Sequence, residues 1–207
     1  SPYGWLPDGS GVIVSRSGVG DNQTQLARLD GGPTRTLFAA PAGNVTAYPS
    51  PDGSKVAFIL GRGGRTTLWV QDTSGGPARQ LTTDGLEGAR VQQMWSPDGR
   101  FVLYASRRTG TSDLWTANVE TGELRQLTQD IRNDWAGTWS PDGHWVLFNS
   151  DRGAQQDLWV VAAEGGPARR VTNDVPQEGG TGWSPDGRAI VFVRRNVSMS
   201  VDAMATE

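Results

Sequence analysis

Trp95-Ser96-Pro97-Asp98-Gly99-Arg100, followed by the apolar run Phe101-Val102-Leu103-Tyr104, is a stretch that the chain repeats at a nearly constant interval. The prolines of its five copies are Pro7, Pro51, Pro97, Pro141 and Pro185, which are 44, 46, 44 and 44 residues apart. A second marker keeps this phase in Thr67-Leu68-Trp69, Asp113-Leu114-Trp115 and Asp157-Leu158-Trp159, with a degraded copy at Gln25-Leu26-Ala27. A third follows in Arg35-Thr36-Leu37, Arg79-Gln80-Leu81-Thr82, Arg125-Gln126-Leu127-Thr128 and Arg169-Arg170-Val171-Thr172. Three markers in one phase indicate that one structural unit has been copied along the chain.

Repeats of about 40–45 residues that each hold several short strands are typical of β-propeller blades. In the third copy we expect strands over residues 91–95, 101–106, 113–117 and 123–128, with a tight turn at residues 96–99. The predicted fold is therefore all-β, a propeller of four-stranded antiparallel blades with about 44 residues in each blade. The repeats span approximately residues 1–43, 44–89, 90–133 and 134–177, with a partial fifth over 178–207, and are expected to form one domain over 1–207.

The fifth copy is incomplete. Two strands are expected in it, over residues 181–183 and 189–193, but residues 196–204 lack the Leu-Trp marker and no fourth strand follows. Either the fifth blade is short and the ring closes imperfectly, or the chain is part of a larger ring of about six to eight blades. We favour the larger ring because the first copy opens directly on its first strand.

Composition excludes several classes of function. The formal net charge is −3 and the 19 basic residues are scattered, so neither nucleic-acid binding nor membrane insertion is expected. The chain has no cysteine, which removes disulfides and thiol chemistry. The 28 glycines, 12 prolines and 9 tryptophans suit an all-β repeat with many turns and bulky packing residues.

The residues that could suggest a metal site or catalysis have simpler explanations. Turn chemistry accounts for Asp8, Asp52, Asp98, Asp142 and Asp186, because a short acceptor side chain caps a Pro-Asp-Gly turn. His144 is the single histidine and lies in such a turn, which rules out a histidine-rich zinc site. The chain has no Gly-x-Ser-x-Gly motif. We therefore expect no catalytic residues, no metal and no cofactor.

A rule for locating the site follows from the repeat: copied residues maintain the fold, and residues that differ between copies are free to bind. In an antiparallel blade the Pro-Asp-Gly turns lie at one end, whereas the variable loops after the second strand and before the first strand lie at the other. The candidates for partner binding on this loop face are Arg90, Gln92, Asp134, Trp135, Glu178, Arg107, Arg108 and Arg152. We expect Trp135 and Arg90 to contribute most, because aromatic and arginine side chains dominate protein interfaces.

The order Trp-Ser-Pro-Asp-Gly, apolar strand, Asp-Leu-Trp and Arg-Gln-Leu-Thr resembles the repeat of the TolB-like β-propeller family, whose namesake is a periplasmic protein of the Tol-Pal envelope system. Similar repeats occur in the propellers of prolyl-oligopeptidase-type and tricorn peptidases. The resemblance covers the second to fourth copies well, although Pro49 replaces the tryptophan of the second copy. It implies a protein or peptide partner at the channel mouth and a periplasmic or otherwise extracytoplasmic location.

Two alternatives stay open. The chain could be the substrate-gating propeller of a prolyl-oligopeptidase-type serine peptidase, or the ligand-sensing propeller of a membrane-tethered regulator. The full reading frame separates the three hypotheses, because a peptidase requires a hydrolase domain with a nucleophile elbow and a tethered sensor requires a transmembrane segment.

Overall fold

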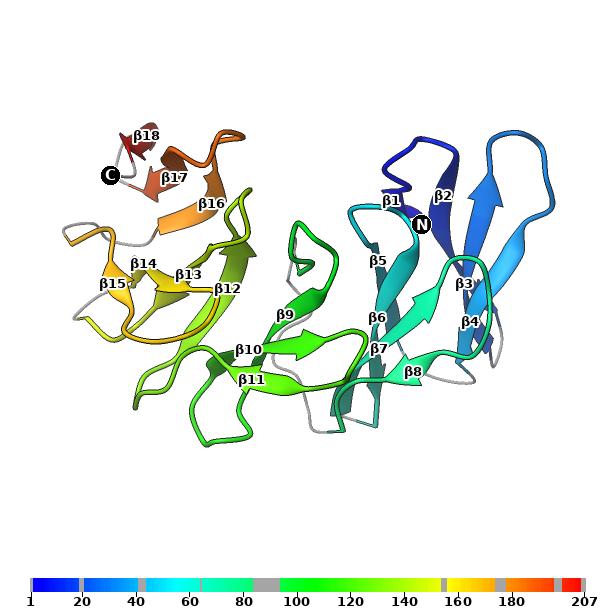
Figure 1. Cartoon of the computed structure of the whole chain (residues 1–207), viewed down its shortest axis with the longest axis horizontal. Helices are drawn as coiled ribbons and strands as arrows, with labels where there is room; N and C mark the ends of the chain where they lie inside the picture. The colour runs from blue at the N-terminus through cyan, green and yellow to red at the C-terminus, as the bar shows by residue number, and fades with distance from the viewer. Residues whose placement is uncertain are drawn as a thin grey trace. The chain divides into compact units, whose positions relative to one another are not determined.

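A computed structural model of the chain describes residues 2–18, 21–40, 44–63, 65–83, 94–153, 156–173, 178–195 and 199–205. These residues form antiparallel β-sheets (Figure 1). None of them forms a helix that is long and apolar enough to cross a membrane. The chain divides into two compact units, Ser1–Ala89 with Val119–Gly122, and Arg90–Asn118 with Glu123–Glu207, which are described separately.

The first unit contains two four-stranded meanders, in which each strand pairs with the next along the chain. The first meander consists of β1 (Pro2–Trp5), β2 (Gly11–Gly18), β3 (Asp21–Arg28) and β4 (Arg35–Ala40). The second consists of β5 (Asn44–Pro49), β6 (Lys55–Arg62), β7 (Arg65–Asp72) and β8 (Arg79–Gln80). A shared core that includes Leu6, Ile13, Val45 and Phe58 packs the two sheets together.

The second unit contains three meanders of the same kind. The first comprises β9 (Phe101–Ser106), β10 (Asp113–Asn118) and β11 (Leu124–Gln126). The next comprises β12 (Asp134–Trp139), β13 (Trp145–Ser150), β14 (Asp157–Ala162) and β15 (Arg169–Arg170). The last comprises β16 (Glu178–Trp183), β17 (Ala189–Arg195) and β18 (Met199–Ala205). Two apolar clusters, which include Leu103 with Trp139 and Leu147 with Phe192, lie between these sheets.

The predicted strands of the third copy are confirmed where the structure describes them. The strand over 101–106 has the predicted bounds, and those predicted over 113–117 and 123–128 are β10 and the shorter β11. Residues 91–93 of the predicted first strand lie outside the described residues, but Trp95 forms a β-bridge with Val102. The fifth copy differs from the prediction because β18 supplies a third strand. Main-chain pairing with β17 does not require the Leu-Trp marker, and Met199, Val201 and Ala203 still alternate with other residues.

The position of the second marker in the first copy is also corrected. Ile13 pairs with Leu26, whereas its repeat equivalent Ala57 pairs with Val70. The equivalent of Leu68-Trp69 is therefore Thr24-Gln25 and not Leu26-Ala27. Pairing decides the phase, because Thr24 is as fully buried as Leu68 although it is not apolar.

The Pro-Asp-Gly turns have the predicted structure. In the third copy Ser96 Oγ lies 2.6 Å from Asp98 Oδ1 and accepts a hydrogen bond from the Phe101 amide at 2.9 Å. Asp98 Oδ1 also accepts from the Arg100 amide at 3.0 Å, and Gly99 adopts a positive φ of 69°. Serine and aspartate oxygens make the same contacts in the second, fourth and fifth copies. The carboxylates of these aspartates therefore accept hydrogen bonds within their own turns.

The other copied residues also hold the blades together. Thr128 Oγ1 accepts a hydrogen bond from the Leu114 amide at 3.0 Å, and Thr82 and Thr172 act in the same way on the equivalent leucines. The Trp139 indole donates to the Met94 carbonyl of the preceding blade at 3.3 Å. The repeated positions are therefore occupied with packing and main-chain hydrogen bonding, as the repeat predicts.

Candidate functional site

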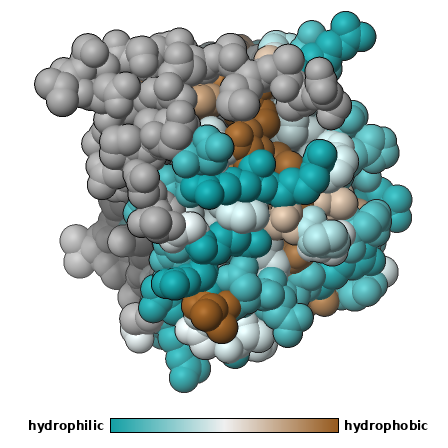
Figure 2. All heavy atoms as spheres, turned by 90° about the vertical axis from the view of Figure 1, so that its left-hand side faces the viewer, coloured by the Kyte–Doolittle hydropathy of each residue, from teal (hydrophilic) through white to brown (hydrophobic). Residues whose placement is uncertain are grey.

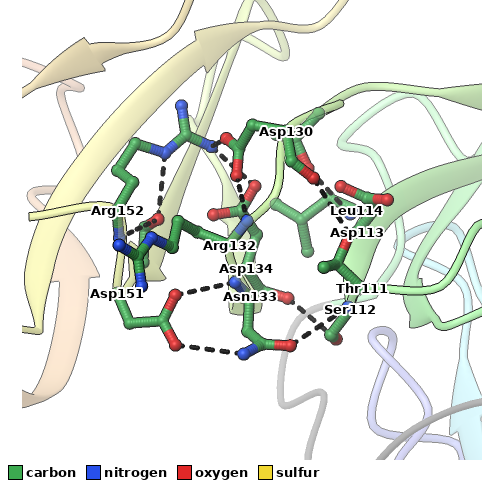
Figure 3. A network of polar contacts seen from close by, with 12 residues as sticks. Thr111, Ser112, Asp113, Leu114, Asp130, Arg132, Asn133, Asp134, Asp151 and Arg152 are labelled. Atoms are coloured by element: carbon green, nitrogen blue, oxygen red, sulfur yellow. Dashed lines mark hydrogen bonds and ion pairs between the residues drawn. The ribbon is translucent and has the colours of Figure 1, made fainter.

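Three segments of the second unit meet at the loop end of the third and fourth blades (Figure 3). They are the loop over residues 107–112 after β9, the connection over 127–133 before β12, and the loop that starts at Asp151 after β13. The meander topology brings them to one end, because each successive strand reverses direction.

Asn133 links all three segments. Its main-chain amide donates to Asp151 Oδ1 at 2.7 Å, and its side-chain amide donates to Asp151 Oδ2 at 3.0 Å. Its side-chain carbonyl accepts from the Ser112 amide at 3.2 Å, while the Asp134 amide donates to the Ser112 carbonyl at 2.7 Å. Main-chain and side-chain bonds together fix the connection between the two blades.

Arg152 is the cation at the centre of this network. Its Nη2 atom lies 2.7 Å from Asp130 Oδ2 and 2.6 Å from Asp134 Oδ2. Its Nε atom donates to Ser150 Oγ at 2.9 Å, and its guanidinium carbon lies 4.8 Å from the centre of the Trp159 ring. A planar guanidinium can make all these contacts because its five donors are fixed in one plane and its face can stack on an aromatic ring.

Carboxylates outnumber the cation that they surround. Burial raises the pKa of Asp134 above its ordinary value, against the hydrogen bonds from Ser150 and Thr128 and the charge of Arg152. Burial also raises the pKa of Asp113. A hydrogen bond from Thr109 lowers this pKa, whereas the negative charge of Asp130 raises it further. The charge of Arg152 acts against the effect of burial on Asp134 and favours its charged form.

The structure brings two of the predicted residues together and encloses them. Asp134 has an exposed fraction of 0% and the Arg152 side chain one of 17%, so both face the scaffold more than the solvent. Arg107 and Arg108 are exposed. The Arg108 guanidinium lies 4.4 Å from the Trp115 ring centre, which is the repeat-equivalent place of Arg152 over Trp159. Arg108 and Arg152 therefore occupy the same position in two copies of the repeat, although the sequence analysis counts both among the variable residues.

Trp135 lies in an irregular part of β12. Its register partner is Asn149, and the pairing with β13 is interrupted by a bulge between Trp135 and Thr138. Ala136, inside this bulge, adopts a φ of 53°, a left-handed conformation that non-glycine residues seldom take. Bulges redirect neighbouring side chains, and Trp135 is partly exposed. Arg90 and Gln92 lie outside the described residues, and Glu178 begins β16 with Arg194 as its register partner.

The sequence interpretation missed Ile131. This side chain has an exposed fraction of 85%, and it stands between Asp130, which is bound by Arg152, and the exposed Arg132. Figure 2 shows the side of the molecule formed by the last sheets, where the coloured surface is largely hydrophilic with small hydrophobic patches. No sequence signal marks an exposed isoleucine, because its exposure depends on how the connection over residues 127–133 folds.

The residues considered for metal binding or catalysis do not gather into a site in the described part of the chain. No group of three or more potential metal ligands occurs there. His144 is exposed, and its main-chain amide donates to Asp142 Oδ1 at 3.0 Å. That contact belongs to a Pro-Asp-Gly turn.

Comparisons with known proteins agree on the fold, and the match to a family model shows the family. The sequence is 35% identical over 80 residues to the Tol-Pal system protein TolB of Anaeromyxobacter dehalogenans strain 2CP-C, which is 39% of this chain and 18% of that protein. The chain thus spans less than a fifth of this curated relative. A putative TolB from Agrobacterium tumefaciens matches in structure with a TM-score of 0.67 and 24% identity, over 99% of this chain and 76% of that chain.

A puromycin hydrolase matches with a TM-score of 0.75 and 21% identity, over 99% of this chain and 35% of that chain. At this identity the likeness shows the fold alone, and it confirms the predicted propeller class. The TolB beta propeller domain family matches residues 85–207. Because this match covers more than half of the chain, the chain belongs to the TolB beta propeller domain family.

Proposed function

We propose that the chain is a non-catalytic binding module that holds a protein or peptide on its loop face, at the mouth of a propeller channel. The curated relative is a Tol-Pal system protein, which supports a protein partner and a periplasmic or otherwise extracytoplasmic location. In this proposal residues 1–207 act as one domain, and neither a cofactor nor nucleic acid takes part.

The observation that carries the proposal is the bracing of the loop face. Asn133 and Arg152 fix segments that differ between the copies, and this bracing leaves Arg107, Ile131 and Arg132 exposed above it. A rigid surface loses less conformational entropy when a partner binds than a mobile one does. A module that only packed against neighbouring blades would not need this network at its solvent-facing end.

The predicted site residues divide into two roles. Asp134 and Arg152 are positioning residues, because Asp134 is buried and Arg152 is engaged with it. Trp135, Arg107 and Arg108 are proposed to contact the partner. We also include Arg90, Gln92 and Glu178 in the proposed contact surface because of their positions in the sequence.

The test selects peptides from a random display library on the wild-type chain and measures their affinity for variants. Trp135→Ala and Arg107→Ala are expected to weaken binding about 30-fold, which corresponds to the roughly 2 kcal/mol typical of an interface anchor. His144→Ala, at the turn end of the same blade, is the matched control and should bind as the wild type does.

Two results would contradict the proposal. One is a set of selected peptides whose binding is lost with His144→Ala and retained with the other two variants. The other is cleavage of the bound peptides, seen by mass spectrometry, which would indicate a catalytic role. A large fall in the melting temperature of Trp135→Ala would place Trp135 in the core, and Arg107→Ala would then decide whether the loop face binds.

A further inference from the structure

A cavity of about 720 Å³ opens at the Pro-Asp-Gly end of the first two blades, within the first unit. Its lining includes the apolar side chains of Leu6, Leu26 and Pro33 and the polar residues Arg35 and Ser74. We propose that this cavity binds a carboxylate carried on an apolar body, with Arg35 as the contact for the anion. The proposal concerns the turn end of the blades and does not depend on the proposed function of the loop face.

The size and composition of the cavity suit a small ligand or a short peptide segment. Ligand sites usually have volumes of about 300–1,000 Å³, apolar walls and a few polar groups that fix orientation. The walls here are also fixed in place. Thr73 Oγ1 donates to the Gly53 carbonyl at 2.8 Å, and the Leu29 amide donates to the Ser10 carbonyl at 3.0 Å.

The first copy departs from the repeat at Leu6, which lines the cavity, and at the nearby Gly11. Leu6 stands where the later copies have serine, and Gly11 stands where they have Lys55, Phe101 and Trp145. A Cβ atom at Gly11 would lie 3.0 Å from Leu26 Cδ1 and 3.5 Å from Leu6 Cδ1. The two leucines therefore take the space that a side chain at position 11 would need.

Arg35 is the cation in the cavity that lacks an acidic partner. Its repeat equivalent Arg125 pairs with Glu164 of the next blade at 2.6 Å. The residue of the second blade that corresponds to Glu164 is Ser74, so Arg35 donates instead to the Ser74 carbonyl at 2.6 Å. Among the described residues no carboxylate pairs with Arg35, whereas a carboxylate ligand could replace the missing glutamate.

The other cation of the cavity is already neutralised. Arg28 Nη2 and Nε donate to Asp30 Oδ2 at 2.7 and 3.0 Å, and Asp8 also acts on this guanidinium. An anion is thus directed to the Arg35 end and away from Asp8. A guanidinium binds a carboxylate through charge-assisted hydrogen bonds, and the apolar body of the ligand would cover Leu6, Leu26 and Pro33.

The test titrates three probes into the labelled chain and follows the amide signals of Leu26 and Ser74 by NMR. The probes are N-acetyl-leucine, its neutral amide, and the blocked peptide acetyl-Leu-Glu-Leu-amide. N-acetyl-leucine is expected to shift these signals and to bind at least about tenfold more tightly than its amide. Tighter binding of the blocked peptide than of N-acetyl-leucine would identify an acidic peptide side chain as the source of the carboxylate, and the reverse order a free acid.

Two variants and a matched control test the role of Arg35. Arg35→Gln removes the charge, and Ser74→Glu supplies the internal carboxylate that the fourth blade has at Glu164. Each is expected to weaken N-acetyl-leucine binding at least about tenfold. Arg125→Gln removes the equivalent arginine outside the cavity and should leave binding unchanged. Equal binding of acid and amide, unchanged binding to Ser74→Glu, or no shift at the cavity would overturn the proposal.

Discussion

Replacement of Arg152 by methionine should destabilise the chain more than any other single change at the loop face. The variant keeps an unbranched side chain over Trp159 but removes the guanidinium that pairs with Asp130 and Asp134. Removal of one partner from a buried ion pair usually costs about 3–5 kcal/mol, because the other charge stays buried without compensation. Asp134 is fully buried, whereas Asp130 can reach water with 27% of its side chain exposed, so we expect a loss of about 3 kcal/mol.

Two further variants separate the ion pair from the general effect of mutation. In the double variant Arg152→Met with Asp134→Asn the fully buried charge is removed and only Asp130, which can reach water, loses its partner, so the total loss should fall to about 1–2 kcal/mol. Arg108→Met changes the repeat-equivalent arginine, which is exposed and stacks on Trp115, and should cost less than about 1 kcal/mol.

Urea denaturation followed by tryptophan fluorescence gives the free energy of unfolding of each variant. The reasoning fails if Arg152→Met costs no more than Arg108→Met. It also fails if the double variant loses as much stability as Arg152→Met alone, because the stranded carboxylate would then contribute nothing.

Three more predictions concern the scaffold. Ala136→Gly should raise the free energy of unfolding by up to about 1 kcal/mol and Ala136→Val should lower it by about 1–2 kcal/mol, since Ala136 has a φ of 53°. Thr128→Val should cost about 1–3 kcal/mol in urea denaturation, because the buried Leu114 amide loses its acceptor. Hydrogen bonds, first from Ser50 and then from Ser54, lower the pKa of Asp52 from 3.8 to about 2. Its contribution to stability is therefore present above pH 3.8 and lost as the pH falls toward 2, so the stability difference between wild type and Asp52→Asn should shrink over that interval.

The blades could be predicted from the sequence because each copied residue has a local task. Ser96 and Asp98 cap their own turn, and Thr128 binds the main chain of the neighbouring strand. Such contacts depend on short distances along the chain or on pairing within one sheet, and both recur with the repeat. The exception is the Leu-Trp marker of the first copy. A buried Thr24 occupies the position of the leucine there, so the residue type does not reveal the alignment with the other copies.

The candidate site could be predicted only as a face and not as a set of contacts. The position of Asp134 and Arg152 in variable segments makes them candidates, but their partners are decided by side-chain packing. The repeat pattern does not predict side-chain exposure. Asp134 is buried, whereas the apolar Ile131 nearby is almost fully exposed. Polar residues in a loop indicate where a site lies, and the exposure of each side chain decides whether it can contact a partner.

A comparison of the two copied arginines explains how one repeat yields different surfaces. Arg108 and Arg152 both stack on the tryptophan of their own blade, so the stacking is part of the copied unit. Their environments differ because the guanidinium of Arg152 also lies beside the carboxylates of Asp130 and Asp134. The corresponding sequence positions of the third copy are occupied by Leu86 and Arg90. With these two carboxylates Arg152 forms ion pairs that brace the loops of the fourth copy. The same stacking contact is therefore combined with different neighbours in each copy, and in the fourth copy those neighbours make it part of the bracing of a variable face.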